Sequence, residues 1–134
     1  MAIKTVALIG AGNMGSRMAR CIKRAGFELT VCDQDLGVLE SFAKEGVTTT
    51  QHPRACANAD AIIVLVANDE QILSVTGGEA GFAHAIPADH HPLICMMSTT
   101  LPTTLKQVAE QLKATRARLI DAPVSGGLVK AELG

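Results

Sequence analysis

Residues 5–15 read Thr5-Val6-Ala7-Leu8-Ile9-Gly10-Ala11-Gly12-Asn13-Met14-Gly15. The apolar run before the first glycine predicts a buried β-strand, and the pattern after the glycines predicts a helix. Glycines at this spacing allow a tight turn, bare backbone next to a pyrophosphate and close packing of the helix on the strand. The N–H groups of the first helical turn would attract the phosphates. The stretch therefore predicts a strand-turn-helix unit that binds a dinucleotide through residues 10–15.

The residues that follow complete a βαβ unit. Apolar residues at three- and four-residue steps predict a helix over 13–25, which Gly26 closes, and a second strand over 27–32. Asp33 follows that strand, roughly 20 residues after the first glycine, where a carboxylate binds the adenine-ribose hydroxyls. A carboxylate at this position repels a 2′-phosphate, so Asp33 predicts NAD rather than NADP. The alternative is that 10–15 is only a strand-to-helix turn and Asp33 a solvated turn residue.

Strands and helices continue to alternate over the rest of the chain, with no repeat or low-complexity linker. Strands are expected at 47–49, 61–67, 93–97 and 118–120, and helical segments at 36–43, after Pro53, at 70–75 and from about 101 onward. Ser98, Thr99 or Thr100 is a candidate N-cap of that last helix, with Pro102 in its first turn. This alternation predicts an α/β fold with a doubly wound parallel sheet, whose strand-end loops share one edge.

Composition excludes several classes of function. The net charge is −1, and the chain has three Phe but neither Trp nor Tyr, so it lacks both the basic surface and the aromatic platforms of nucleic-acid binders. No apolar run approaches a membrane span, and the N-terminus has a strand in place of a signal peptide. We therefore expect neither nucleic acid nor membrane as a partner, and a cytoplasmic location.

Cysteines and histidines do not predict a metal site. The four cysteines have no metal-binding spacing and lie in or beside apolar stretches, which favours free, mostly buried thiols. His90 and His91 are adjacent in a stretch flanked by prolines, a poor geometry for chelating one ion. A solvated loop is the expected structure there.

Three motifs in order carry a family resemblance: residues 10–15, Ser98-Thr99-Thr100-Leu101-Pro102, and Asp121-Ala122-Pro123-Val124-Ser125-Gly126-Gly127. Together they resemble the β-hydroxyacid dehydrogenases, which include 3-hydroxyisobutyrate dehydrogenase, tartronate semialdehyde reductase and L-threonate dehydrogenase, with 6-phosphogluconate dehydrogenase more distant. The resemblance covers all 134 residues and matches only the N-terminal half of that family. It implies a Rossmann-type fold for residues 1–134, cut short soon after loop 121–127.

The resemblance also implies roles for single residues. The backbone at Asn13 and Met14 would face the pyrophosphate, Val66 and Ala67 would line the cofactor, and Thr99 would lie near the nicotinamide ribose. Val66 and Ala67 replace a Leu-Pro pair found in many members, and a helix cap is the competing interpretation of Thr99. The resemblance also implies a substrate loop, which consists of Ser125, Gly126 and Gly127 and would hold the carboxylate of the substrate. The alternative for that loop is a glycine-rich turn without a ligand.

The family's proton-transferring lysine lies in a glycine-rich motif beyond this stretch, and no such motif occurs before Gly134. Lys130 lacks the family context and is expected to be solvated. The implied activity is hydride transfer between NAD and a small β-hydroxyacid, by a longer protein that forms homo-oligomers through its second domain. We therefore expect a cofactor-binding part without turnover of its own. The alternative is a complete, non-catalytic dinucleotide-binding module that senses or pairs with something.

Overall fold

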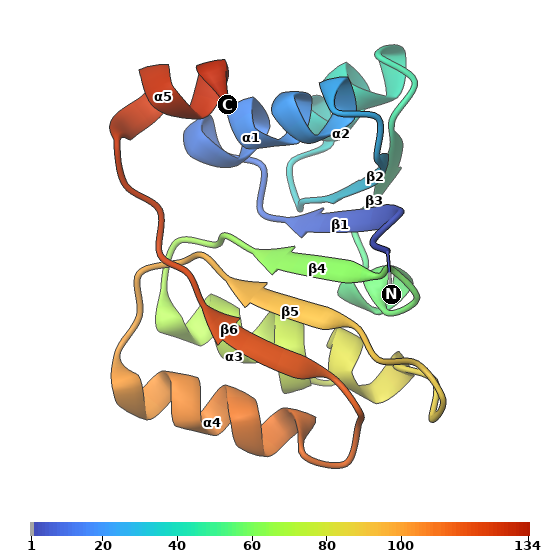
Figure 1. Cartoon of the computed structure of the whole chain (residues 1–134), viewed down its shortest axis with the longest axis vertical. Coiled ribbons are helices and arrows are strands. Elements are labelled where there is room, and N and C mark those ends of the chain that lie inside the picture. Colours follow the sequence, from blue (N-terminus) through green and yellow to red (C-terminus); the bar gives the residue numbers. More distant parts are fainter. Residues whose placement is uncertain (1) are drawn as a thin grey trace.

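Six parallel strands form one sheet in the order β3-β2-β1-β4-β5-β6 (Figure 1). The computed structural model describes residues 2–134. The strands are β1 (Thr5–Ile9), β2 (Glu28–Cys32), β3 (Thr48–Thr50), β4 (Ala61–Val64), β5 (Leu93–Met96) and β6 (Arg118–Asp121). This order confirms the predicted doubly wound, Rossmann-type sheet, in which the chain moves outward from β1 on one side and from β4 on the other.

Helices connect the strands and cover the sheet on both faces. They are α1 (Asn13–Arg24), α2 (Leu36–Lys44), the short 3₁₀ turn η1 (Pro53–Cys56), α3 (Asp69–Gly77), a second 3₁₀ turn η2 (Phe82–Ala85), α4 (Pro102–Leu112) and α5 (Gly127–Leu133). In Figure 1, α1 and α2 lie on one side of the strands and α3 and α4 on the other. Two separate apolar cores result, one on each face of the sheet.

The central strands send successive side chains into these two cores. Ala7 and Ile62 belong to one core, while Leu8 and Ile63 belong to the other, and all four are buried. Because neighbouring side chains of a strand point to opposite faces, a strand covered on both faces is apolar at every position. That is why the apolar runs of β1 and β4 allowed these strands to be predicted from the sequence.

The β4 strand is shorter than the predicted strand over 61–67. It ends at Val64. The Leu65 N–H still donates to the Ile9 carbonyl of β1 at 2.8 Å, but side chains accept the next two backbone N–H groups. The Val66 N–H donates to Ser98 Oγ at 2.8 Å, and the Ala67 N–H donates to Gln71 Oε1 at 2.8 Å. The apolar segment 65–67 therefore forms a loop at the carboxyl edge of the sheet.

The expected hydroxyl cap of α4 is wrong, although the proline prediction is right. Leu101 occupies the N-cap position without a side-chain hydrogen bond, and Pro102 lies in the first turn. The hydroxyls have other partners: Ser98 Oγ bonds the backbone of Val66, and Thr100 Oγ1 donates to Asp69. These hydroxyls join separate loops, a long-range role that local sequence rules do not reveal.

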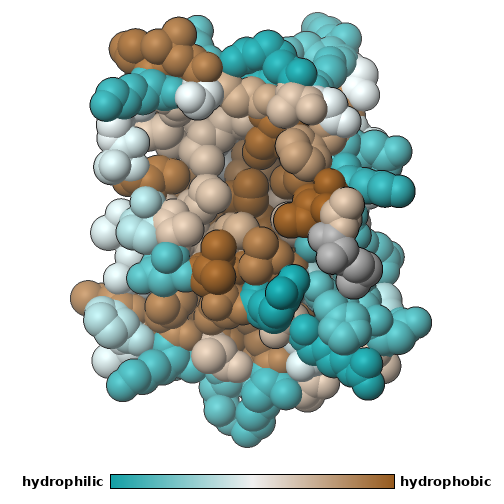
Figure 2. Space-filling model, viewed as in Figure 1, coloured by the Kyte–Doolittle hydropathy of each residue, from teal (hydrophilic) through white to brown (hydrophobic). Residues whose placement is uncertain are grey.

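The β6 edge and the last helix carry exposed apolar side chains. Ile120 of β6 is 44% exposed, and Val129 and Leu133 of α5 are 71% and 78% exposed. Figure 2 shows apolar residues gathered in the middle of one face, over the strands, with hydrophilic residues above and below. Helices α1 and α2 lie over the other half of the sheet, so this side of β5 and β6 has little helical cover (Figure 1).

Candidate dinucleotide-binding site

An open cavity of about 1020 Å³ lies at the carboxyl ends of the central strands. β1 and β4 are neighbours there, and their following connections run to opposite sides of the sheet. Such a switch point is where open α/β sheets bind ligands. The lining comes from the loops after β1, β2, β3 and β4 and from α1 and α3: Ile9, Gly10, Gly12, Asn13, Met14, Gly15, Cys32, Asp33, Gln34, Gln51, His52, Pro53, Leu65, Val66, Ala67, Asn68, Glu70, Gln71, Ser74, Val75 and Ala80.

The three glycines of the first loop differ in what surrounds them. Gly10 has φ +99°, and a Cβ there would lie 2.1 Å from the Leu65 carbonyl oxygen. A Cβ on Gly15 would lie 2.2 Å from the Gly10 carbonyl oxygen, so α1 needs a glycine to approach the strand-end loop. A Cβ on Gly12 would meet no atom of the described residues 2–134 within 4 Å. Internal packing thus explains Gly10 and Gly15, whereas Gly12 faces open space at the cavity.

The N-terminus of α1 opens onto this cavity without a protein cap. Gly12 is the N-cap residue, and no side chain of residues 2–134 accepts a hydrogen bond from the first turn as a cap. Asn13, Met14 and Gly15 form that turn and line the cavity. First-turn N–H groups lack partners within a helix and attract anions. The arrangement is suited to a phosphate group.

Asp33 holds the glycine loop as well as lining the cavity. Its Oδ2 accepts the Ala11 N–H at 2.8 Å, and its Oδ1 accepts the Asp35 N–H at 2.8 Å. Ala11 itself is buried beneath the loop, with 1% of its surface exposed. Asp33 is half-buried, so its carboxylate remains accessible from the cavity.

The opposite wall consists of the loop after β4 and the start of α3. Val66 and Ala67, the pair that the family resemblance assigns to the cofactor, line the cavity. Ser98, which is buried, fixes this wall by accepting the Val66 N–H and donating to the Val66 carbonyl. Asn68 caps α3 through the Gln71 N–H at 2.9 Å.

A hydroxyl-carboxylate cluster joins this wall to the loop after β5. Asp69 accepts hydrogen bonds from Thr100 Oγ1 at 2.6 Å and Thr104 Oγ1 at 2.8 Å. These two hydroxyl bonds lower the pKa of Asp69 below its usual value. Thr99 lies between the anchored residues, is exposed, and does not line the cavity.

The predicted substrate loop lies outside the cavity lining. Ser125, Gly126 and Gly127 are exposed, and both glycines have positive φ, +96° and +76°. They follow β6, which ends at the same edge of the parallel sheet as β1 and β4. The structure therefore groups most of the cofactor candidates in one cavity and places this loop on the same sheet edge but apart from them.

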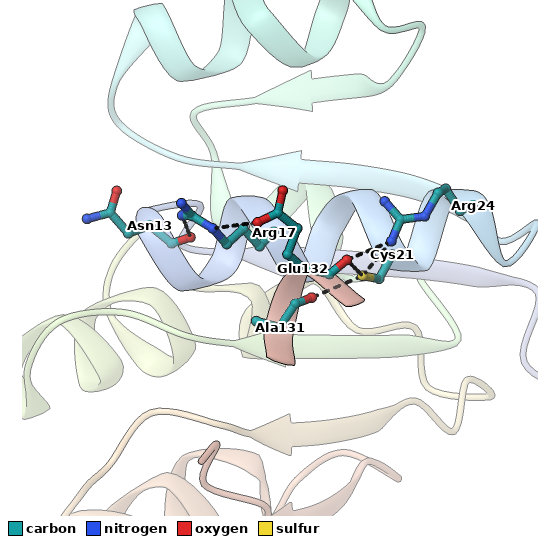
Figure 3. Close-up of polar contacts among 6 residues, drawn as sticks. All are labelled: Asn13, Arg17, Cys21, Arg24, Ala131 and Glu132. Atoms are coloured by element: carbon teal, nitrogen blue, oxygen red, sulfur yellow. Dashed lines mark hydrogen bonds and ion pairs between the residues drawn. The ribbon is translucent and has the colours of Figure 1, made fainter. Parts of the chain in front are cut away.

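Helix α5 is held on α1 by polar contacts (Figure 3). Arg24 Nη2 donates to the Glu132 carbonyl at 2.9 Å, and Cys21 Sγ donates to the Ala131 carbonyl at 3.0 Å. The Glu132 carboxylate lies 3.7 Å from Arg17 Nε. The helix whose N-terminus faces the cavity thus also fixes the end of the Ser125 loop. Lys130 on α5 is exposed, as predicted.

Sequence reasoning missed one end of the cavity. Gln34, Gln51, His52 and Pro53 line it, from the turns that follow β2 and β3. The signal available in the sequence was positional, because any residue just after a parallel strand lies at the ligand-binding edge. Applied to the weak strand expected at 47–49, that rule points to the residues from 50 onward, where the lining residues 51–53 lie.

Two cysteines meet beneath this end of the cavity. Cys32 lines the cavity, and Cys56 lies in η1 within the same core. A hydrogen bond from Cys56 lowers the pKa of the Cys32 thiol, while the same bond and burial raise the pKa of Cys56. All four cysteines are free, and three of them are buried, as predicted.

Within residues 2–134, no group of three His, Cys, Asp or Glu side chains is placed to hold a metal ion. Over the same residues, none of the helices combines the length and the apolar character required to span a bilayer. His90 does not conform to the expected solvated loop. It is half-buried and its Nε2 lies 2.8 Å from the Ala59 carbonyl oxygen.

Proteins with similar sequences include two dehydrogenases of hydroxyacids. The 3-hydroxyisobutyrate dehydrogenase of Pseudomonas aeruginosa is 32% identical over 96% of this chain and 43% of its own length. The L-threonate dehydrogenase of Cupriavidus necator is 31% identical over 98% of this chain and 44% of its own length. The chain therefore spans less than half the length of these relatives.

Solved structures agree with the sequence relatives. The crystal structure of 3-hydroxyisobutyrate dehydrogenase from Salmonella typhimurium superposes with a TM-score of 0.84 at 30% identity, covering 97% of this chain and 45% of that one. The Mycobacterium tuberculosis 3-hydroxyisobutyrate dehydrogenase with L-serine gives 0.84 at 28% identity, covering 98% and 44%. The family described as the NAD binding domain of 6-phosphogluconate dehydrogenase matches residues 5–134. Because that match takes in every strand and helix described above, the chain belongs to the family of the NAD-binding domain of 6-phosphogluconate dehydrogenase.

Proposed function

We propose that the cavity at the β1–β4 switch point binds NAD in preference to NADP. The observation that carries the proposal is Gly12, which lines the cavity although a Cβ there would touch no atom in the part of the chain that the structure describes. Gly10 and Gly15 are explained by internal contacts, so Gly12 is the glycine that a ligand requires. A pyrophosphate against its backbone, at the uncapped start of α1, supplies that requirement.

Asp33 supports the preference for NAD. Its carboxylate lines the cavity beyond the glycine loop, where the adenine ribose of a dinucleotide would lie. Ribose hydroxyls can donate to a carboxylate, whereas a 2′-phosphate would be repelled by it. No Lys or Arg is among the described residues that line the cavity, so the pocket wall offers no cation to a 2′-phosphate.

For the whole protein, the proposed reaction is hydride transfer to or from a small β-hydroxyacid. Relatives named 3-hydroxyisobutyrate dehydrogenase and L-threonate dehydrogenase support this substrate class. In the proposal the nicotinamide supplies the hydride chemistry, and this chain binds and orients it. In the proposal Val66 and Ala67 line the cofactor, and Thr99, outside the cavity lining, approaches the nicotinamide ribose from the neighbouring loop. Ser125, Gly126 and Gly127 receive the substrate carboxylate.

The residues of this chain do not complete that reaction in the proposal. Oxidation of an alcohol needs a general base for the hydroxyl proton. The cavity has no lysine among its described lining residues, and Lys130 lies exposed on α5. We therefore assign to the 134-residue chain cofactor binding without efficient turnover.

The test is a calorimetric titration of the chain with NAD⁺ and NADP⁺, alongside Asp33→Asn. We expect NAD⁺ to bind at least about tenfold more tightly than NADP⁺, and the difference to shrink in the variant as a charge repulsion of roughly 1–2 kcal/mol is removed. Asp89→Asn, at an exposed loop position, is the matched control. Equal or tighter binding of NADP⁺ by the unaltered chain would overturn the assignment.

A further inference from the structure

Two glutamines hold together the turns that form one end of the cavity. Gln34 Nε2 donates to the Gln51 carbonyl at 2.7 Å, and Gln51 Nε2 donates to the Gln34 carbonyl at 3.1 Å. The turns follow β2 and β3, just beyond the last paired residues of those strands. Each side-chain amide therefore binds the other residue's backbone, which continues the link between the strands into the cavity wall. We refer to Gln34 and Gln51 as the amide clamp.

The amide clamp lies next to the carboxylate that would meet the ribose. Asp33 immediately precedes Gln34, and its own N–H donates to the Thr50 carbonyl at 3.2 Å. The turn that contains Asp33 is thus held to the end of β3 and the turn after it in two ways. One is the backbone hydrogen bond from Asp33 to Thr50, and the other is the clamp. Its Oδ2 is also held by the Ala11 N–H. A carboxylate restrained in this way cannot swing aside to accept a larger group beside it.

The clamp also fixes the orientation of the two amides at this end. Each side-chain amide nitrogen donates one of its two N–H groups to a backbone carbonyl, so a ligand at this end meets amides that are already held in place. The other described lining residues contributed by these two turns are Asp33, His52 and Pro53, and none is Lys or Arg. An unphosphorylated ribose is therefore favoured for two reasons. The Asp33 carboxylate is negatively charged, and it is restrained at the place where a 2′-phosphate would lie.

We propose that the amide clamp of Gln34 and Gln51 is a positioning element that sets the choice between NAD and NADP. It acts through Asp33, by holding its carboxylate at the ribose position. This inference rests on the proposed function, because it assumes that a dinucleotide places its adenine ribose beside Asp33. It adds two residues that the glycine and Asp33 motifs do not include.

The experiment compares Gln34→Met and Gln51→Met with the unaltered chain. Methionine has a similar length and no amide donor, so each variant removes one bond of the clamp. The probes are ADP-ribose and 2′-phospho-ADP-ribose, which differ only at the group in question, titrated by calorimetry together with NAD⁺ and NADP⁺. The control is Gln107→Met, a surface position on α4 far along the chain from the clamp.

We expect each clamp variant to bind ADP-ribose about three- to tenfold more weakly, the loss typical of one hydrogen bond that positions a ligand group. Binding of 2′-phospho-ADP-ribose should stay the same or improve, so the selectivity ratio falls. Gln107→Met should leave both affinities unchanged. A melting curve of each variant establishes that it is folded at the temperature of the titration.

Separate results identify which inference fails. If the unaltered chain binds neither NAD⁺ nor NADP⁺, the proposed function and the clamp fall together. If it prefers NAD⁺ and the clamp variants lose affinity for both probes by the same factor, the clamp is merely structural and this inference alone is overturned. Unchanged affinities in both variants overturn it as well.

Discussion

Gly12 and Gly15 both lack a side chain, for different reasons. Gly15 lets α1 approach the first loop, because a Cβ there would lie 2.2 Å from a backbone oxygen. Gly12 has an ordinary backbone conformation, with φ −70°, and open space around its Cα. Gly15 is therefore required by the fold, whereas Gly12, in the proposed function, is required by the ligand.

We expect Gly12→Ala to fold normally and to bind NAD⁺ weakly. Its stability should change by less than about 1 kcal/mol, since the backbone suits alanine, while the added methyl group lies where the pyrophosphate would approach. Affinity should fall by at least about tenfold, as for the loss of one close contact to a phosphate. Thermal melting and calorimetry measure the two effects.

Gly15→Ala is the matched comparison for that variant. The methyl group of Gly15→Ala would clash with the Gly10 carbonyl oxygen, and no rotamer change can relieve this clash. We therefore expect a loss of stability of about 1–3 kcal/mol. A Gly12→Ala protein that melts as early as Gly15→Ala would show that Gly12 also serves internal packing. Unchanged NAD⁺ affinity in Gly12→Ala would contradict the proposed approach of the pyrophosphate.

At the scale of elements, Asp60 ties the start of β1 to the start of β4, at the edge of the sheet opposite the cavity. Its Oδ2 accepts the N–H groups of Lys4 and Thr5 at 2.8 and 3.1 Å. These bonds hold the pKa of Asp60 below its usual value. A folded-state pKa below the unfolded one stabilises the fold fully above the unfolded pKa, and this contribution is lost as the pH falls through the folded pKa.

Asp60→Asn should therefore lower stability at neutral pH, by about 1 kcal/mol or less because the carboxylate lies near the surface. The difference from the unaltered chain should shrink as the pH falls through the lowered folded-state pKa of Asp60, where the carboxylate becomes protonated. Urea unfolding at neutral and acidic pH measures it. A gap that stays constant down to pH 2 would contradict an ionised Asp60 as its cause; Asp89→Asn should show no gap at any pH.

Helix α5 depends on α1 for its order. At seven residues it is too short to persist alone in water, so its contacts with α1 must hold it. Arg24→Ala removes the bond from Arg24 to the Glu132 carbonyl. We expect amide exchange in 127–133 to accelerate about tenfold, as for the loss of one charged hydrogen bond, with the sheet unchanged. Arg116→Ala, an exposed arginine before β6, should leave exchange in α5 as it was.

Most elements could be predicted because their signals are local. The glycine loop, the apolar strands β1 and β4 and the proline of α4 each act through neighbouring residues or through burial on both faces. The errors arose where distant side chains replace local partners. Ser98 ends β4 by binding Val66, and Asp69 binds the hydroxyl of Thr100, one of the residues expected to cap α4. Such pairings join residues about 30 positions apart, and no local pattern records them.

For the whole molecule, parallel topology explains which part of the site was accessible to sequence reasoning. All six strands run the same way, so their following loops gather at one edge. The loops after β1 and β4, which contain most of the residues expected to contact the cofactor, therefore lie together at the cavity. The loops after β2 and β3 contribute Gln34 and Gln51, two residues that belong to no motif, and only the folded structure shows that they meet.

The last prediction concerns turnover by the chain as a whole. Hydride transfer from an alcohol requires a group that takes the hydroxyl proton, and the described lining of the cavity offers no lysine for this task. We therefore expect the purified 134-residue chain to bind NAD⁺ but to form no NADH above background with 3-hydroxyisobutyrate, L-threonate or L-serine. Absorbance at the NADH band during long incubations at high protein concentration measures this.

Lys130→Ala serves as the control for that assay. Lys130 is exposed on α5 and lies outside the cavity lining, so its removal should change neither NAD⁺ affinity nor the background rate. Appreciable NADH formation that persists through repeated purification and disappears in Lys130→Ala would identify this lysine as the acid/base. Activity that survives in Lys130→Ala would locate the proton acceptor in another residue of the chain. Either result would contradict the division of labour proposed here, in which these residues bind and orient the cofactor and proton transfer belongs to a group outside them.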